Sequence, residues 1–338
     1  MFRLALALGG SLLLLLLAAC SGDDGNGDEG QPSASPGASA SPVVGACGNV
    51  VVSEPIDDNL LPLVLSSDLA LGHNRFVVAV YDQEASKPIT DADLHLTFVC
   101  FDSKEGTPVF ESDPEAITLM KTYTHTHEDG TVETHEAGQT GDYVSYVDFD
   151  RAGTWGIDVT GKTADGQDIG PVRLTFSVGI EPFGLAIGDP APQSKQTILS
   201  DVADIREIDT SESPIPEQHN MTIAGAVTSG KPAVIAFATP AFCQSQVCGP
   251  VKEIFDDLYN AYKDRANFVH IEPYDVKKMR EGSCSSLGAC LAPTVNEWKL
   301  QNEPWVFIVG ADGKVAAMFD GIASYDEMET ALKATLGG

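Results

Sequence analysis

Residues 234–251 read VIAFATPAFCQSQVCGPV, and this stretch decides the fold of the C-terminal half. Its first part, Val234 to Phe237, is a compact apolar run of the length of a buried strand. Beyond the two cysteines, apolar residues recur with helical spacing at Val251, Ile254, Phe255, Leu258 and Tyr262. The stretch therefore predicts a strand, a turn that carries Cys243 and Cys248, and a helix.

The chain that follows continues the alternation of strands and helices. Further strands are predicted at Asn267 to Ile271, Trp305 to Val309 and Val315 to Phe319. The last two are joined through Asp312-Gly313, a dipeptide typical of a tight hairpin turn. Capping boxes at Thr294–Glu297 and Ser324–Glu327 predict that two more helices begin there. The predicted order is β-α-β-α-β-β-α.

This order, with a cysteine motif between the first strand and its helix, resembles the thioredoxin family over residues 183–338. The resemblance depends on three pieces: Phe237 to Cys243 with Cys248-Gly249-Pro250 just beyond, Glu303-Pro304 before a strand, and the Asp312-Gly313 hairpin. In that family a cis-proline stands at the position of Pro304. The resemblance implies an α/β thioredoxin-like fold for this half of the chain.

The sequence departs from the family pattern at three positions. Four residues separate Cys243 from Cys248 where the family has two, and Val251 replaces the second cysteine of the Cys-Gly-Pro-Cys motif. Ala236 stands where the family has a buried acid, so proton transfer would need water or another group. The nucleophile can therefore be either cysteine.

The resemblance implies thiol–disulfide exchange with an exported protein, with Cys243, Cys248 and Pro304 as catalytic residues and no dissociable cofactor. A helix N-terminus lowers the pKa of a thiol, and Glu303 beside the proline is expected to contact the substrate. Two alternatives remain open. One is a copper-delivery protein in which His270 approaches the cysteine pair. The other is a surface binding protein in which the pair is a structural disulfide.

The preceding half, residues 47–180, has the pattern of an all-β domain. Short apolar runs are separated by turn signals such as Asp129-Gly130 and Ala152-Gly153. The predicted strands are Phe76 to Tyr81, Leu94 to Phe101, Tyr143 to Phe149, Trp155 to Val159 and Val172 to Val178. The pattern predicts an immunoglobulin-like β-sandwich ahead of the thioredoxin-like domain.

The N-terminus predicts export and a lipid anchor. Residues 1–20 combine one positive charge, a short apolar run and the ending Leu17-Ala18-Ala19-Cys20, which resembles the bacterial lipobox acylated on cysteine. Residues 21–46, rich in Gly, Ser, Pro and Asp, predict a disordered linker. The expected location is extracytoplasmic, lipid-anchored to a bacterial cell membrane. A formal net charge of −29 argues against a nucleic-acid partner.

Seven cysteines are present, and six remain once Cys20 is assigned to the lipid. In an oxidising compartment they can form three disulfides. Cys47 with Cys100 and Cys284 with Cys290 are expected to be structural pairs, whereas Cys243 with Cys248 is the candidate redox pair. A second redox relay through Cys284 and Cys290 is the weaker alternative.

Three histidines, at positions 125, 127 and 135, lie on either side of Asp129-Gly130. A two-residue turn there would place Thr124 opposite His135, with His135 on the face opposite His125 and His127. The sequence thus favours a solvated polar hairpin over a metal site, and no metal ligand is predicted.

Overall fold

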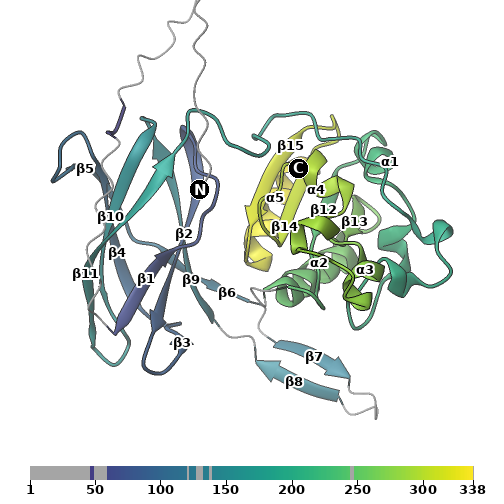
Figure 1. Ribbon diagram of the computed structural model, residues 1–338, viewed down its shortest axis with the longest axis horizontal. Coiled ribbons are helices and arrows are strands. Elements are labelled where there is room, and N and C mark those ends of the chain that lie inside the picture. The colour runs from purple at the N-terminus through teal and green to yellow at the C-terminus, as the bar shows by residue number, and fades with distance from the viewer. Residues whose placement is uncertain are drawn as a thin grey trace, which may run out of the picture. The chain divides into compact units, whose positions relative to one another are not determined.

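A computed structural model describes residues 46–48, 59–119, 122–126, 132–136, 139–243 and 247–337. The predicted signal peptide, Cys20 and nearly all of the predicted linker lie outside these residues. The chain from Val44 onward forms one compact unit. Figure 1 shows the order of its elements.

The first β-rich region contains two antiparallel sheets. One sheet has the order β1 (Leu60–Val64), β2 (Gly72–Asp82), β9 (Gln139–Phe149) and β6 (Glu115–Thr118), with β3 (Lys87–Pro88) also paired to β2. The other has the order β11 (Asp168–Val178), β10 (Gly153–Lys162), β4 (Asp93–Cys100) and β5 (Thr107–Ser112). All five predicted strands are present, and β1, β3, β5 and β6 were not predicted.

The two sheets share one hydrophobic core. Alternate residues of each strand point into it, as Phe76, Val78 and Val80 do in β2 and Leu94, Leu96 and Phe98 do in β4. This spacing of two is what a strand requires when one of its faces is buried. The sheets therefore pack face to face as the two layers of a β-sandwich.

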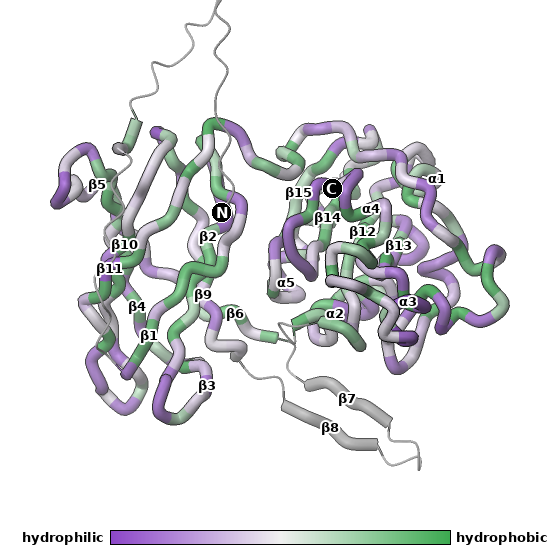
Figure 2. The backbone as a smooth tube through the Cα atoms, viewed as in Figure 1, coloured by the Kyte–Doolittle hydropathy of each residue, from purple (hydrophilic) through white to green (hydrophobic). Residues whose placement is uncertain are grey.

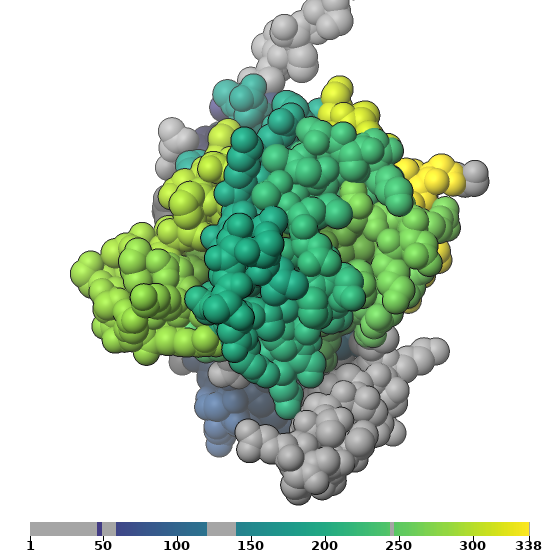
Figure 3. Space-filling model, turned by 90° about the vertical axis from the view of Figure 1, so that its right-hand side faces the viewer, coloured from purple at the N-terminus to yellow at the C-terminus, as the bar shows by residue number. Residues whose placement is uncertain are grey.

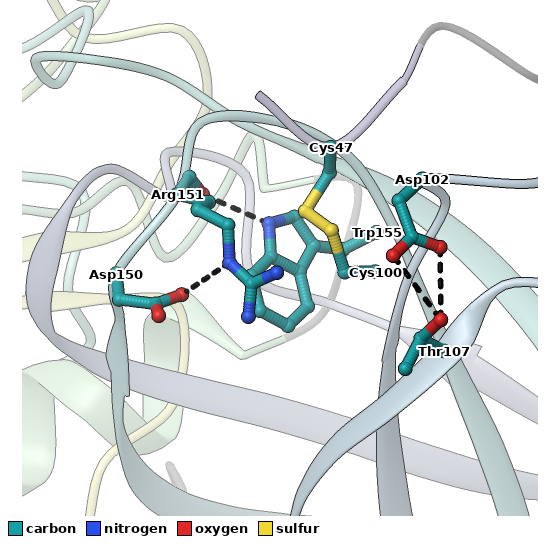
Figure 4. The surroundings of a disulfide bond; sticks show 7 residues. All are labelled: Cys47, Cys100, Asp102, Thr107, Asp150, Arg151 and Trp155. Carbon is teal, nitrogen blue, oxygen red and sulfur yellow. Dashed lines mark hydrogen bonds and ion pairs between the residues drawn. A yellow bond between two sulfur atoms is a disulfide. The ribbon is translucent and has the colours of Figure 1, made fainter. Parts of the chain in front are cut away.

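The Cys47–Cys100 disulfide closes one end of this core (Figure 4). Cys100 lies opposite Trp155 in the pairing of β4 with β10, and the disulfide and the indole belong to the same buried cluster. The indole N–H donates to the carbonyl oxygen of Arg151 at 2.9 Å, so the polar atom of this buried ring has a partner. The disulfide thus joins the start of the described chain to a central strand, as the sequence predicted.

A separate hairpin pairs β7 (Thr122–Thr126) with β8 (Val132–Glu136). Its register differs by one residue from the two-residue turn that the sequence predicted, because Tyr123, not Thr124, lies opposite His135. The two-residue turn on which the sequence-based argument about His135 depended is therefore not present in this register. His127 lies outside the described residues.

The second region is built on a four-stranded sheet with the order β13 (Asn267–Ile271), β12 (Ala233–Phe237), β14 (Trp305–Val309) and β15 (Val315–Asp320). β12 and β13 are parallel and joined through α2 (Cys248–Tyr262), whereas β14 and β15 are antiparallel neighbours. β12 also pairs antiparallel with β14 at the centre of the sheet. A β-α-β unit followed by a β-β-α unit in this order is a thioredoxin-like fold.

Both faces of this sheet are covered, which explains why its central strands are continuously apolar (Figure 2). Val234 and Ala236 of β12 pack with the buried stripe of α2 and with Met328 and Leu332 of α5 (Tyr325–Thr335). Ile235 and Phe237 pack in a second cluster on the opposite side. That cluster includes residues of α1 (Ile223–Val227) and the buried Trp298.

One of the two predicted capping boxes is present at the N-terminus of a helix, and the other is not. Ser324 caps α5 as predicted, because its hydroxyl accepts the Glu327 N–H at 3.1 Å while Glu327 accepts the Ser324 N–H at 2.9 Å. The box at Thr294 is wrong. The helix α4 (Pro293–Glu297) begins one residue earlier, with Ala292 at the N-cap, because proline is favoured in the first helical turn.

The remaining helical segments are short and were not predicted. They are α3 (Val276–Glu281) and the 3₁₀ turns η1 (Leu199–Asp201), η2 (Ile205–Glu207), η3 (Pro216–His219) and η4 (Leu287–Cys290). Three of the 3₁₀ turns belong to the segment 183–222, which runs over one face of the molecule (Figure 3, teal to green). This segment carries two residues of the buried cluster described below.

Candidate functional site

Cys243 and Cys248 lie in the turn between the central strand and its helix. β12 ends at Phe237, and α2 begins at Cys248 itself. The two cysteines form a disulfide with their Cα atoms 6.0 Å apart. Cys248 is fully buried, whereas Cys243 is half-buried. Cys243 is thus the member of the pair that solvent reaches.

The first turn of α2 supplies a hydrogen bond to the sulfur of Cys243. The Cys248 N–H donates to Cys243 Sγ at 3.3 Å. The Cys243 N–H in turn donates to the Thr239 carbonyl at 3.0 Å, which fixes the start of the loop. Unpaired N–H groups and the positive end of the helix dipole stabilise a thiolate at this position.

Glu303 and Pro304 lie at the same end of the sheet. The peptide bond between them is cis, as the sequence predicted. Pro304 is buried and leads directly into β14, whose first residue, Trp305, lies opposite Phe237 at the end of β12. The register therefore places Pro304 beside the point where the chain leaves the sheet toward Cys243.

The Glu303 carboxylate has one hydrogen-bond donor, the phenol of Tyr274 at 3.0 Å. Partial burial raises the pKa of Glu303 above its ordinary value of 4.5, and the bond from Tyr274 opposes this shift only in part. Burial and the nearby carboxylate also raise the pKa of Tyr274. An acid with a raised pKa therefore lies next to the cis-proline.

The Cys284–Cys290 disulfide closes the loop after α3, with the two Cα atoms 5.8 Å apart. The loop is tied to the chain near Tyr274, because the Asp275 N–H donates to the Cys290 carbonyl at 2.7 Å. Tyr274 and Leu291 also form an isolated β-bridge. This pair therefore braces the segment that positions the Tyr274 phenol.

A buried polar cluster lies on the parallel edge of the sheet, and the sequence did not predict it. It consists of Asp209, His219 and His270, whose side chains are at most 3% exposed. Asp209 Oδ2 lies 2.8 Å from His219 Nε2 and 3.3 Å from His270 Nδ1. His270 comes from β13, opposite Ala236, whereas the other two come from the irregular segment 183–222.

The members of the cluster shift one another's pKa values. Burial alone would raise the pKa of Asp209, but the rings of His219 and His270 and the ammonium of Lys252 hold it well below its usual range. Burial lowers the pKa of His219, and contact with the Asp209 carboxylate opposes that shift. Asp209 is therefore ionised inside the protein.

Glu272 is a second buried acid near the turn. Its carboxylate accepts the Thr210 N–H at 2.7 Å, and the Thr210 hydroxyl accepts the Ala241 N–H at 3.1 Å, two residues before Cys243. Burial raises the pKa of Glu272. Ala236 stands at the position of the family's buried acid, and no motif in the sequence pointed to Glu272, which follows the neighbouring strand β13.

The environment of His270 bears on the copper alternative. One ring nitrogen, Nε2, is 3.0 Å from the Ala238 carbonyl oxygen, and the other faces Asp209. The contacts of this ring are therefore with the backbone of the turn and with Asp209. This arrangement differs from the sequence-based alternative, in which His270 approaches the cysteine pair.

The sheet order and the disulfide at the strand-to-helix turn define this part of the chain as a thioredoxin-like domain. No protein-family model matches the chain, and no curated protein matches it. Two solved structures are similar to parts of it. One is a thiol:disulfide interchange protein, thioredoxin family protein, from Chlorobium tepidum TLS, with 15% identity, a TM-score of 0.27, and 45% of this chain and 99% of that chain covered.

The second is the PmoD soluble domain from Methylocystis sp. ATCC 49242 (Rockwell). It is 19% identical, has a TM-score of 0.18, and is covered over 75% of its length by 32% of this chain.

Proposed function

We propose that this protein is an extracytoplasmic thiol–disulfide oxidoreductase that is lipid-anchored to a bacterial cell membrane and acts on exported proteins. In this proposal an immunoglobulin-like sandwich precedes a thioredoxin-like domain, and Cys243 and Cys248 are the redox pair. One observation carries the proposal: Cys243 is half-buried, unlike the fully buried Cys248, and its sulfur accepts an N–H from the first residue of α2 in a thioredoxin-like turn.

The proposed reaction begins at Cys243. A thiolate of the partner attacks Cys243 Sγ, the Cys243–Cys248 bond breaks, and Cys248 leaves as a thiolate. A second partner thiolate then attacks the mixed disulfide and releases Cys243, so that two electrons pass to this protein and the partner gains a disulfide. The same steps run in reverse when the partner is the oxidised member, and the relative potentials set the direction.

Glu303 and Pro304 are the proposed substrate contacts. They lie at the end of β14 where the chain approaches the cysteine turn, and an extended partner segment can pair with exposed backbone beside such a proline. Because burial raises its pKa, the Glu303 carboxyl keeps its proton to a higher pH than an exposed glutamate does. Tyr274 and the braced loop behind it are proposed to position this carboxylate.

The experiment compares two variants of the mature chain, in each of which one cysteine of the pair is replaced by serine. Each variant is mixed with glutathione disulfide, and glutathione adducts are assigned to residues by mass spectrometry. Cys248→Ser is expected to accumulate an adduct on Cys243 rapidly, because Cys243 is accessible and no resolving thiol remains. Cys243→Ser is expected to react at least about tenfold more slowly, because the Cys248 sulfur is buried.

Equal rates in the two variants would contradict the assignment of Cys243 as the nucleophile. Absence of an adduct in both variants would contradict the oxidoreductase function and favour a structural disulfide in a binding protein. Retention of the Cys47–Cys100 and Cys284–Cys290 bonds, read in the same spectra, verifies that each variant keeps its other pairs.

A further inference from the structure

We infer that Asp209, His219 and His270 form a binding site for one divalent transition-metal ion of the Zn²⁺ class. This inference goes beyond the proposed thiol–disulfide exchange and does not depend on it. Among the described residues, the three side chains offer one ligand atom each, and these atoms all lie within 4.8 Å of one another. Two imidazole nitrogens and one carboxylate oxygen are a donor set that suits Zn²⁺.

The second ring nitrogen of His270 is the strongest geometric reason for a cation here. One nitrogen, Nε2, faces the Ala238 carbonyl oxygen at 3.0 Å, which fixes the orientation of the ring. The other, Nδ1, is buried, has no hydrogen-bond partner among the described residues, and lies 3.3 Å from Asp209 Oδ2. An ion held between these two atoms would give the buried nitrogen a partner.

Two of the three proposed ligands, Asp209 and His270, are also oriented by hydrogen bonds to groups outside the cluster. The Ser211 N–H donates to Asp209 Oδ1 at 2.8 Å, and the Ser211 hydroxyl donates to the same oxygen, which leaves Oδ2 to face the two histidines. The Ala238 carbonyl fixes the ring orientation of His270 in the same way. Outer partners of this kind are a regular feature of metal sites, because they fix the tautomer and the orientation of the ligands.

His219 requires one change on metal binding. Its Nε2 now lies 2.8 Å from Asp209 Oδ2, the distance of a hydrogen bond. Coordination through Nε2 requires the ring proton on Nδ1, so the hydrogen bond is replaced by a metal–nitrogen bond and no net proton is lost from a neutral ring. The observed distances are those of a site that closes around an ion with small side-chain movements.

Charge and access are both compatible with an ion. The nearby Lys252 ammonium forms an ion pair with Asp256, with its Nζ 2.6 and 2.8 Å from the two carboxylate oxygens, which offsets part of its repulsion of an ion. His219 and His270 also line a cavity of about 570 Å³. Water from this cavity would supply the fourth position, as in zinc sites with three protein ligands.

The test uses the mature chain with its disulfides oxidised, so that the cysteines do not compete for metal. All proteins carry His125→Gln, His127→Gln and His135→Gln, which removes the other histidine-rich segment as a source of binding. Each protein is stripped with a chelator and equilibrated with Zn²⁺. The bound metal is measured by mass spectrometry, and the affinity by competition with a chromophoric chelator.

The expected result is one equivalent of Zn²⁺ in this background. Asp209→Asn and His219→Gln are expected to weaken the affinity at least about tenfold. His73→Gln, which changes an exposed histidine outside the cluster, is the matched control and should bind as the background does. Ser211→Ala keeps all three ligands and should weaken binding by less than Asp209→Asn, which distinguishes positioning of the carboxylate from its loss.

Two results would overturn the inference: less than a tenth of an equivalent bound in the background, or unchanged affinity in both ligand variants. Circular dichroism of each variant separates loss of the site from loss of the fold. Where a ligand variant does not fold, the visible spectrum of bound Co²⁺ decides, because imidazole and carboxylate ligation in a tetrahedral site gives intense bands that the hexa-aquo ion lacks. A spectrum identical to free Co²⁺ in the folded background would also contradict the site.

Discussion

At the scale of single residues, the two cysteines of the turn differ in their burial and in their hydrogen bonds. Cys248 is buried at the start of α2, whereas Cys243 is half-exposed and its sulfur accepts the Cys248 N–H. The sequence predicted the pair but left the nucleophile open, because four intervening residues allow two alignments with the family pattern. The difference in exposure and the N–H contact from Cys248 favour Cys243, and neither can be deduced from spacing.

Glu303 gives a prediction that depends on pH. Because burial raises the pKa of its carboxyl in the folded chain, the group binds its proton at a pH where an exposed glutamate is ionised. Its contribution to stability is therefore fully present below the unfolded pKa and is lost as the pH rises through the folded pKa. Glu303→Gln should remove this part of the pH dependence of the free energy of unfolding.

The titration itself can be followed by ¹³C NMR of labelled glutamate carboxyls. The midpoint of Glu303 is expected above 4.5, and Tyr274→Phe should raise it further, because the phenol stabilises the ionised form. The unfolded chain is the reference. A folded midpoint at or below 4.5 would show that the carboxyl is fully solvated and would remove its proposed role beside Pro304.

The buried cluster shows what residue-level reading of the sequence missed. Asp209 and His219 are separated by 10 positions, His270 lies much further along the chain, and the three follow no metal-ligand spacing. They meet because the segment 183–222 lies against the parallel edge of the sheet, where β13 brings in His270. Only the tertiary fold carries this information.

The strands and helices were predicted most accurately where burial imposes a clear pattern of apolar residues on the sequence. β13 and β14 have the predicted bounds, because both are short and almost fully buried, and β14 is apolar throughout. β5 and β6 were missed, because their residues are mostly exposed or half-buried and carry little apolar alternation. The start of α4 was misplaced because Pro293 takes the first helical position, which puts Ala292 at the N-cap in place of Thr294.

The cap of α5 gives a prediction at this scale. Ser324→Ala removes the acceptor of the Glu327 N–H and is expected to lower the free energy of unfolding by about 1 kcal/mol. Ser286→Ala is the matched control, because Ser286 occupies the N-cap of η4 without a side-chain cap bond and is exposed. Urea unfolding measures both.

The interpretation of the capping box is wrong if Ser324→Ala costs no more than the control. Restoration of most of the lost stability by Ser324→Asp would support it, since aspartate also accepts a hydrogen bond from the first turn of a helix.

The described part of the chain contains three disulfides, and the full sequence is strongly acidic. Disulfides persist in oxidising compartments, which agrees with an extracytoplasmic location. In the part of the chain that the structure describes, no helix is long and apolar enough to cross a membrane. The proposed membrane attachment is the lipid at Cys20.

Cys20→Ser tests the anchor in intact cells. Because acylation requires the cysteine thiol, the variant is expected to move from the membrane fraction to the soluble fraction, and the lipid should be absent from its N-terminal peptide by mass spectrometry. Ser21→Ala, which leaves the lipobox cysteine in place, is the control. Membrane attachment of Cys20→Ser equal to that of the control would contradict a lipid anchor at this residue.

The central claim is that Cys243 and Cys248 exchange electrons with other proteins. A redox titration of the mature chain, with thiols trapped by alkylation and each cysteine assigned by mass spectrometry, tests it most directly. The account predicts that these two cysteines titrate together and reversibly above about −300 mV, while Cys47–Cys100 and Cys284–Cys290 stay oxidised to lower potentials. If Cys243–Cys248 stays oxidised well below about −300 mV, along with the other two pairs, the bond is structural and the oxidoreductase function is contradicted.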